Sequence, residues 1–150
     1  MKSFYDNECV ADVKGRLQQL QPNNPRLWGK MNAPQAVAHC AAAMEWALGE
    51  KRPRRLFVGR VIGHFIKPLV MRDDEPMRRN SPTTPELIIG EERDLANERE
   101  RLCSQIDRFA AGGPAICTTA PHPFFGRLTP EEWAILMYKH VDHHLRQFSA

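Results

Sequence analysis

The residues that decide the fold run from Thr129 to Phe148 and read TPEEWAILMYKHVDHHLRQF. Thr129 and Glu132 stand three positions apart, which is the spacing of a capping box at the start of a helix. Apolar residues then recur every three or four positions, which is the period of one helix face. The predicted inward face consists of Trp133, Leu136, Met137, His140, His144 and Phe148. The stretch therefore predicts a long C-terminal helix that carries two histidines on its buried side.

Further helices are predicted by the same periodicity and by the prolines, most of which lie between the periodic segments. The expected ranges are 6–20, 32–48, 56–71, 88–111 and 129–148. Pro68 should kink or end the third of these helices, because proline lacks an N–H and clashes with the preceding turn. Residues 116–119 are expected to be extended but are too short to found a sheet. The sequence thus predicts one all-α domain over residues 1–150, an up-down bundle of four main helices with an additional short helix at 56–71.

Composition limits the class of protein. The chain has 150 residues, of which 42% are hydrophobic, as in a globular domain rather than a disordered chain. No apolar run approaches the roughly 20 residues of a membrane span, and the first residues include acids where a signal peptide would be apolar. The four cysteines lack metal-binding spacings and favour free thiols in a reducing compartment. We therefore expect a cytoplasmic protein with no membrane span.

The net charge of +3 is unevenly distributed. Basic residues gather most densely between Lys51 and Arg60, and the remainder of the chain is slightly acidic. Such a stretch could contact nucleic acid, a membrane surface, an acidic partner or an anionic substrate, although a run of charge is usually a solvated face. The acids at 73–75 and the scarcity of interleaved aromatic residues argue against nucleic acid.

The histidines of the last helix are the main candidates for chemistry. His140 and His144 lie one turn apart, so that both imidazoles can converge on one metal ion. The alternative is a pair of hydrogen-bonded core histidines. His143 is rotated away from the centre of the inward face, and Asp142 points to roughly the opposite side.

His39, in the helix expected at 32–48, is a third candidate ligand. Its neighbours on the inward face include Ala36, Ala43 and Ala47, whose small side chains suggest a gap beside the imidazole. Three histidines would leave coordination positions open, as in catalytic rather than structural metal sites. Spacing alone does not establish that His39 faces the last helix. Cys40 is expected to be a core residue rather than a ligand.

Two segments resemble a known family. One comprises Arg26-Leu27-Trp28-Gly29-Lys30-Met31 with Ala36-Val37-Ala38-His39-Cys40. The other extends from His122-Pro123-Phe124-Phe125-Gly126 through the helix described above. Together they resemble the DUF1569 group of the DinB/YfiT-like superfamily. The resemblance implies a DinB-like four-helix bundle in which a divalent metal, zinc or nickel, is held by His39, His140 and His144.

The resemblance also implies a class of activity. Characterised members of that superfamily include thiol-dependent transferases and isomerases that use small thiols. We therefore expect a metal-dependent enzyme that acts on a small-molecule substrate with a low-molecular-weight thiol, or less favourably a hydrolase. His143 is the candidate catalytic residue, as a proton shuttle, with a solvated edge histidine as the alternative. The rival function is a non-catalytic stress-response or interaction module with structural or vestigial histidines. A homodimer is compatible with either function.

The segment from His122 to Gly126 has two interpretations. Its two phenylalanines could form a lid over the site, or they could anchor the loop before the last helix as a hydrophobic plug.

Overall fold

A computed structural model describes all residues from 1 to 150 and contains five α-helices and two short 3₁₀ turns. The helices are α1 (Asn7–Gln19), α2 (Ala33–Ala47), α3 (Phe57–Met71), α4 (Leu95–Gly112) and α5 (Pro130–Gln147). The turns are η1 (Pro85–Leu87) and η2 (Gly113–Ile116). There is no β-sheet, so the prediction of an all-α fold is confirmed.

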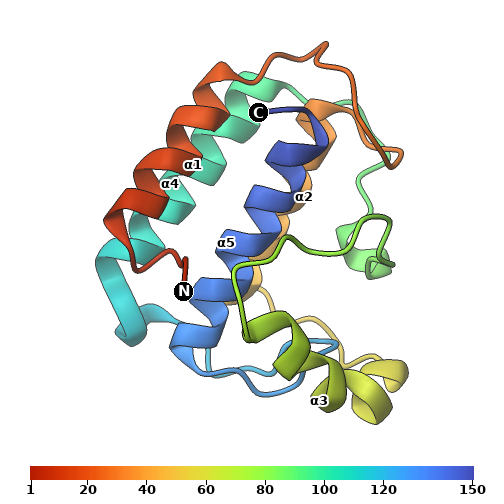
Figure 1. Cartoon of the computed structure of the whole chain (residues 1–150), viewed down its shortest axis with the longest axis vertical. Coiled ribbons are helices and arrows are strands. Elements are labelled where there is room, and N and C mark those ends of the chain that lie inside the picture. Colours follow the sequence, from red (N-terminus) through yellow and green to blue (C-terminus); the bar gives the residue numbers. More distant parts are fainter.

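Helices α1, α2, α4 and α5 form a four-helix bundle. The most extensive packing is between α2 and α4, followed by α2 with α5. Figure 1 shows that α1 and α5 run in one direction and that α2 and α4 run in the other. The directions therefore do not simply alternate along the chain. The segment between α2 and α4 returns to the far end of the bundle, and α3 lies within this connection, across one end of the molecule (Figure 1).

The core is a continuous cluster of buried residues contributed by all four bundle helices. Its largest fully buried side chains include Trp133, Phe4, Phe109, Phe148 and Met44. Burying a side chain of this size contributes roughly 1.5–3 kcal/mol relative to leaving it in water. The bundle interior therefore supplies the main stabilisation of the fold, and it holds α2 and α5 side by side.

The helix caps agree with the sequence patterns. Asn32 and Gln35 form a capping box at the start of α2, and Thr129 and Glu132 form one at the start of α5. These caps satisfy backbone N–H groups that have no partner inside the helix. The capped starts set the register of the two helices that carry the histidines.

One prediction of local structure was wrong. The helix expected at 88–111 begins at Leu95, where the side chain of Asp94 caps it. Ile88 is exposed and Glu91 to Arg93 are polar and exposed, so this stretch has no apolar face to bury. Of the residues expected to be extended at 116–119, Ile116 ends the 3₁₀ turn η2 and the backbone of Cys117 is extended; the segment founds no sheet, as predicted. Pro68 does not end its helix, because α3 continues to Met71.

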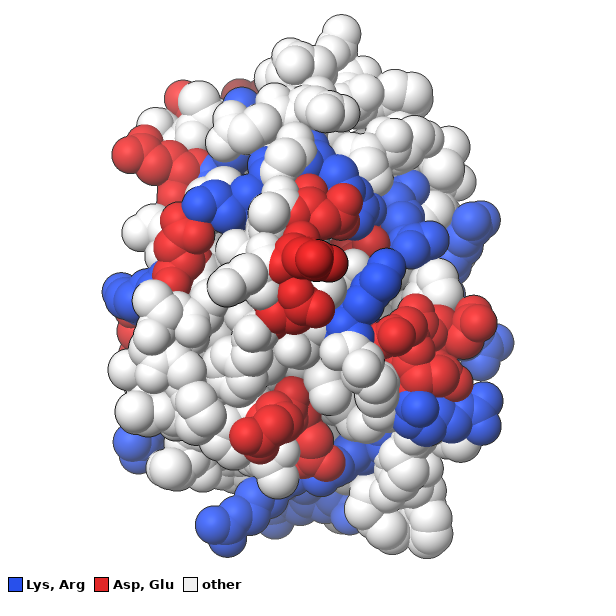
Figure 2. Space-filling model, turned by 60° about the vertical axis from the view of Figure 1, so that its left-hand side comes forward, with Lys and Arg blue, Asp and Glu red and all other residues white.

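The surface of the bundle is charged and mixed. Figure 2 shows acidic and basic side chains interleaved over the face formed by α1 and α4.

The buried carboxylate of Asp142 joins α1 and α5 by accepting hydrogen bonds of 2.7 Å from both Arg16 and Arg146. Asp142 is thus engaged in an ion-pair network with α1 and lies outside the group of residues that could hold a metal ion. None of the helices is both long and apolar enough to cross a membrane.

Candidate metal centre

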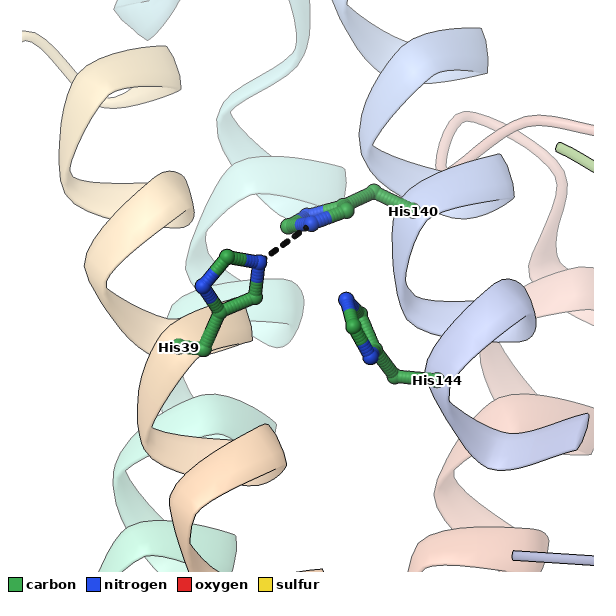
Figure 3. A group of neighbouring side chains, drawn as sticks. All are labelled: His39, His140 and His144. Carbon is green, nitrogen blue, oxygen red and sulfur yellow. Dashed lines mark hydrogen bonds between the residues drawn. The ribbon is translucent and has the colours of Figure 1, made fainter. Parts of the chain in front are cut away.

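Three of the predicted residues meet between α2 and α5. His39 comes from α2, and His140 and His144 come from adjacent turns of α5; their rings converge (Figure 3). One ring nitrogen from each histidine lies within 4.8 Å of those of the other two. His39 is buried, whereas His140 and His144 are partly exposed, so the cluster has one closed side and one open side. The structure therefore shows that His39 faces α5.

A backbone carbonyl orients His39. The Nδ1–H of His39 donates a hydrogen bond of 2.8 Å to the carbonyl oxygen of Leu87. A carbonyl oxygen can only accept, so in a neutral ring the proton lies on Nδ1 and the Nε2 lone pair is free. Leu87 belongs to the turn η1, in the connection between α3 and α4. The turn thus directs the lone pair of His39 towards the two histidines of α5.

A side-chain amide orients His144 in the same way. The Nδ1–H of His144 donates to Oε1 of Gln147 at 2.8 Å, and Nε2 of Gln147 donates to the carbonyl oxygen of Trp28 at 2.7 Å. The second bond fixes which end of the amide faces the imidazole. Gly29 permits this approach, because a Cβ at that position would lie 2.6 Å from Nε2 of Gln147. The Nε2 lone pair of His144 is therefore also free.

His140 completes the cluster through a direct contact. Its Nε2 lies 2.9 Å from Nε2 of His39. Because Nε2 of His39 carries the lone pair, His140 donates in this contact. Two ligand nitrogens of one tetrahedral zinc ion lie roughly 3.3 Å apart when each bond is about 2.05 Å. The separations within the cluster, from 2.9 Å up to 4.8 Å, span this value.

The histidines of the cluster are held in the neutral form that binds metals. Burial lowers the pKa of His39, and it lowers the pKa of His144 to about 3. Burial, together with repulsion from the other two imidazoles, holds the pKa of His140 well below its usual range. All three imidazoles are therefore neutral near neutral pH: His39 and His144 present a free Nε2 lone pair, and His140 presents one once its proton has moved to its own Nδ1. No carboxylate or thiolate joins the group, so the donor set consists of three imidazoles.

His143 lies beside the cluster rather than in it. Its ring centroid is 5.1 Å from that of His144 and 5.4 Å from that of Trp28. The side chain is buried rather than solvated, and this burial lowers the pKa of His143, assisted by the charge of Arg79. Arg79 in turn stacks over the ring of Trp28, 4.3 Å from its centroid. His143 is thus a neutral histidine next to a partly exposed member of the triad.

The alanines expected beside His39 lie in the buried core. Ala36, Ala43 and Ala47 are buried in the packed core, where their small size allows α2 to approach its neighbours. The internal cavity that touches His144 and Cys40 has a volume of about 10 Å³, enough for a single water molecule at most. Cys40 is a buried core residue outside the ligand group, as predicted, and burial raises the pKa of its thiol. All four cysteines are free and buried.

His122 anchors a loop rather than covering the cluster. Its Nδ1 accepts hydrogen bonds from the backbone N–H groups of Phe124 and Phe125, at 3.1 and 3.2 Å. Its ring packs between Trp46 and Trp133. Burial lowers the pKa of His122 to about 3, with a smaller contribution from Arg55. The plug interpretation of this segment therefore describes the structure, and the lid interpretation does not.

We expect the neutral state of His122 to make the fold sensitive to acid. The unfolded chain takes up a proton near pH 6.5, whereas the folded chain does not until about pH 3. This histidine therefore costs no stability above about pH 6.5, and the free energy of unfolding falls by up to about 1.4 kcal/mol per pH unit below it. Asparagine in its place keeps an acceptor for the two N–H groups but does not titrate.

Urea unfolding at a series of pH values measures this effect. The His122→Asn variant should lose stability less steeply on acidification than the wild type. If stability fell equally steeply with pH in the two proteins, His122 would take up its proton in the same pH range in the folded and the unfolded chain, contrary to the expectation.

Comparison with known proteins identifies the family. The sequence matches the family model of DUF1569, described as a protein of unknown function, over residues 6–150. The chain belongs to this family. The match extends over all five helices and includes the three histidines of the candidate metal centre. No curated protein and no solved structure matches the chain.

Two residues that support the centre were not predicted from the sequence of this DUF1569 protein. Gln147 lies three positions after His144, so helical spacing could have suggested that its amide reaches the imidazole. No sequence pattern could have pointed to Leu87, because it contributes a backbone carbonyl oxygen, which every residue has, from a turn distant in the chain. Both contacts depend on side-chain or backbone orientation that the tertiary fold determines.

Proposed function

We propose that this DUF1569 protein binds one divalent metal ion through His39, His140 and His144. The observation that carries the proposal is the orientation of the lone pairs. Leu87 and Gln147 hold Nδ1–H of His39 and His144, so that each Nε2 faces the centre of the cluster. Such outer hydrogen bonds fix the tautomer of ligating histidines in many metal sites. To ligate through Nε2, His140 would adopt the tautomer with its proton on Nδ1, so that the proton that it donates to His39 in the 2.9 Å contact moves to its other ring nitrogen and the imidazole stays neutral.

Zinc and nickel fit this donor set best. Neutral imidazole nitrogens suit both ions, whereas magnesium and calcium prefer oxygen ligands. Three protein ligands leave at least one position for an exogenous molecule, and the partial exposure of His140 and His144 gives access to it. A divalent ion held here would supply Lewis acidity, lowering the pKa of a coordinated thiol or water molecule.

We further propose that the centre is catalytic and acts on small molecules, with transfer to or from a low-molecular-weight thiol as the reaction. In this assignment His143 accepts and returns a proton. It is neutral near pH 7 because burial lowers its pKa, and its ring lies beside that of His144. Trp28 packs against the other side of His143 and excludes water from it. Placement of the family in the DinB-like superfamily stays a prediction, as does a homodimer.

One observation favours a non-catalytic role. The internal cavity next to His144 is about 10 Å³, so a substrate would have to bind at the open side of the cluster rather than inside the bundle. An interaction module with a structural metal ion needs no such space. The two functions differ in whether an exogenous thiol reaches the metal ion.

The test starts with the metal content of untagged protein, purified without chelators and measured by inductively coupled plasma mass spectrometry. We expect about one equivalent of metal in the wild type and none in the His140→Ala/His144→Ala variant. His64→Ala is the matched control, because His64 is exposed on α3 and lies outside the cluster. An absence of metal in the wild type, with no uptake on titration, would contradict the proposal.

The catalytic part is tested with cobalt as a spectroscopic substitute for the native metal. Addition of small thiols should change the visible spectrum of the cobalt protein, and turnover of electrophiles should follow. His143→Ala should retain the metal and the spectral change but lose turnover. A cobalt spectrum insensitive to every thiol would favour the structural role.

A further inference from the structure

Helix α3 exposes an apolar face that nothing in the chain covers. Phe57, Val61, Phe65 and Leu69 follow one another at four-residue intervals, and Val58 and Ile62 lie beside them. The exposed fraction is 80% for Phe57 and 68% for Phe65. Exposed apolar surface that is contiguous in this way is rare on monomeric proteins and usually marks an interaction site.

The orientation of α3 is fixed by its opposite face. Gly59 and Gly63 are the buried residues of the helix, and a Cβ at these positions would lie 2.5 and 2.0 Å from the carbonyl oxygen of Phe124. The two glycines thus allow the helix to press on the loop that His122 anchors. Lys67 adds an ion pair of 2.8 Å with Glu132. Because α3 is held in this way by its opposite face, its apolar residues are left exposed to solvent.

The charge carried by α3 and by the segment that precedes it is of one sign. Residues 51–72 contain seven lysines and arginines and no acidic residue. Arg52, Arg54 and Arg60 are exposed and form no ion pair within the chain. An apolar helix face flanked by unpaired cations is complementary to an anionic lipid surface, where apolar side chains enter the interface and cations meet headgroups.

A second copy of the chain fits this face less well. Pairing two copies through α3 would bring two sets of cations together. Of the acids at 73–75, Asp73 already pairs with Arg72 at 2.9 Å, and Asp74 and Glu75 pair with no cation in the chain. Two such acids in each copy are fewer than the seven lysines and arginines of residues 51–72 in the other.

We propose that α3, with the basic segment that precedes it, docks the protein on membranes containing anionic phospholipids. Phe57 and Phe65 would enter the headgroup region, and Arg52 and Arg54 would contact the phosphates. The binding would be peripheral and reversible, because a single interfacial helix does not insert irreversibly. The proposal does not depend on the metal centre, which lies between α2 and α5.

Flotation of the full chain with vesicles tests the proposal. We expect the wild type to float with vesicles of phosphatidylcholine and phosphatidylserine, but not with phosphatidylcholine alone, and to be released by salt. The Phe57→Ser/Phe65→Ser and Arg52→Gln/Arg54→Gln variants should each bind at least about tenfold more weakly, since each loses one of the two interactions. Their substituted side chains are exposed, so the fold should be retained.

Arg26→Gln/Lys30→Gln is the matched control, because it removes the same charge from exposed residues outside α3. It should bind anionic vesicles as the wild type does. Equal loss of binding in this control would overturn the proposal, since net charge alone would then explain it. Failure of the wild type to bind anionic vesicles would also overturn it. So would a dimer that the phenylalanine variant abolishes, since α3 would then pair two copies.

Discussion

Replacement of His39 by alanine is expected to lower the affinity of the protein for zinc on the order of a thousandfold or more, equivalent to roughly 4 kcal/mol. His39 is the only ligand that α2 provides, and it is the most buried of the three. Without it, two histidines on one helix remain, and they would bind zinc about as a short peptide does. Loss of His39 should therefore cost more than loss of a supporting hydrogen bond.

Calorimetric titration of the metal-free protein with zinc measures this effect, with thermal unfolding as a second readout. Zinc at a hundredfold excess over its dissociation constant should add about 2.7 kcal/mol to the stability of the wild type. The same zinc concentration should add nothing to His39→Ala. If His39→Ala bound zinc as tightly as the wild type, the ligand assignment would be wrong.

Gln147→Leu provides an intermediate case. It removes the acceptor that holds His144 Nδ1–H but leaves all three ligands in place. Supporting contacts of this kind typically contribute 10–100-fold in metal affinity. The affinity of Gln147→Leu should therefore fall between those of the wild type and His39→Ala, which distinguishes a positioning residue from a ligand.

Replacement of Phe109 by alanine is expected to lower the free energy of unfolding by about 3–5 kcal/mol. Phe109 lies in α4, is fully buried, and stacks on Tyr5 with ring centroids 5.4 Å apart. Truncation removes the hydrophobic transfer energy and leaves a cavity that tightly packed neighbours cannot fill. For a domain of this size, each kcal/mol shifts the melting temperature by about 2–4 °C.

Urea unfolding monitored by circular dichroism measures the loss. The matched control is Phe57→Ala, because the same truncation on α3 removes a side chain that is 80% exposed. That variant should change the stability by less than about 0.5 kcal/mol. A loss of several kcal/mol in Phe57→Ala as well would mean that α3 is packed rather than exposed. A small loss in Phe109→Ala would mean that Phe109 is not part of a rigid core.

Local patterns predicted the bundle helices well where they coincide with burial. The capping box at Thr129 located the start of α5, because a cap depends only on residues within one turn. The start of α4 was misplaced because helical periodicity was extended into 88–94, where no neighbouring element covers Ile88. Periodicity alone does not reveal which apolar residues find a partner.

Local patterns likewise predicted only part of the candidate site. The i, i+4 spacing of His140 and His144 places them one turn apart on any helix. The helical pattern of 32–48 proposed His39 and the resemblance to DUF1569 implied the same residue, but spacing could not show which helix His39 faces. The gap beside His39 stays a prediction, because small residues such as Ala36 and Ala43 also allow close helix packing. The catalytic role of His143 stays a prediction.

By itself, the sequence determined the all-α class, the helix caps and the pair of histidines on α5, since each follows from contacts within a few residues. Only the tertiary structure decided that His39 meets that pair, that Leu87 and Gln147 direct the lone pairs, and that the apolar face of α3 stays uncovered. The physical reason is common to all three. They depend on how separate helices pack, which is settled by the summed burial of the whole core rather than by local propensity.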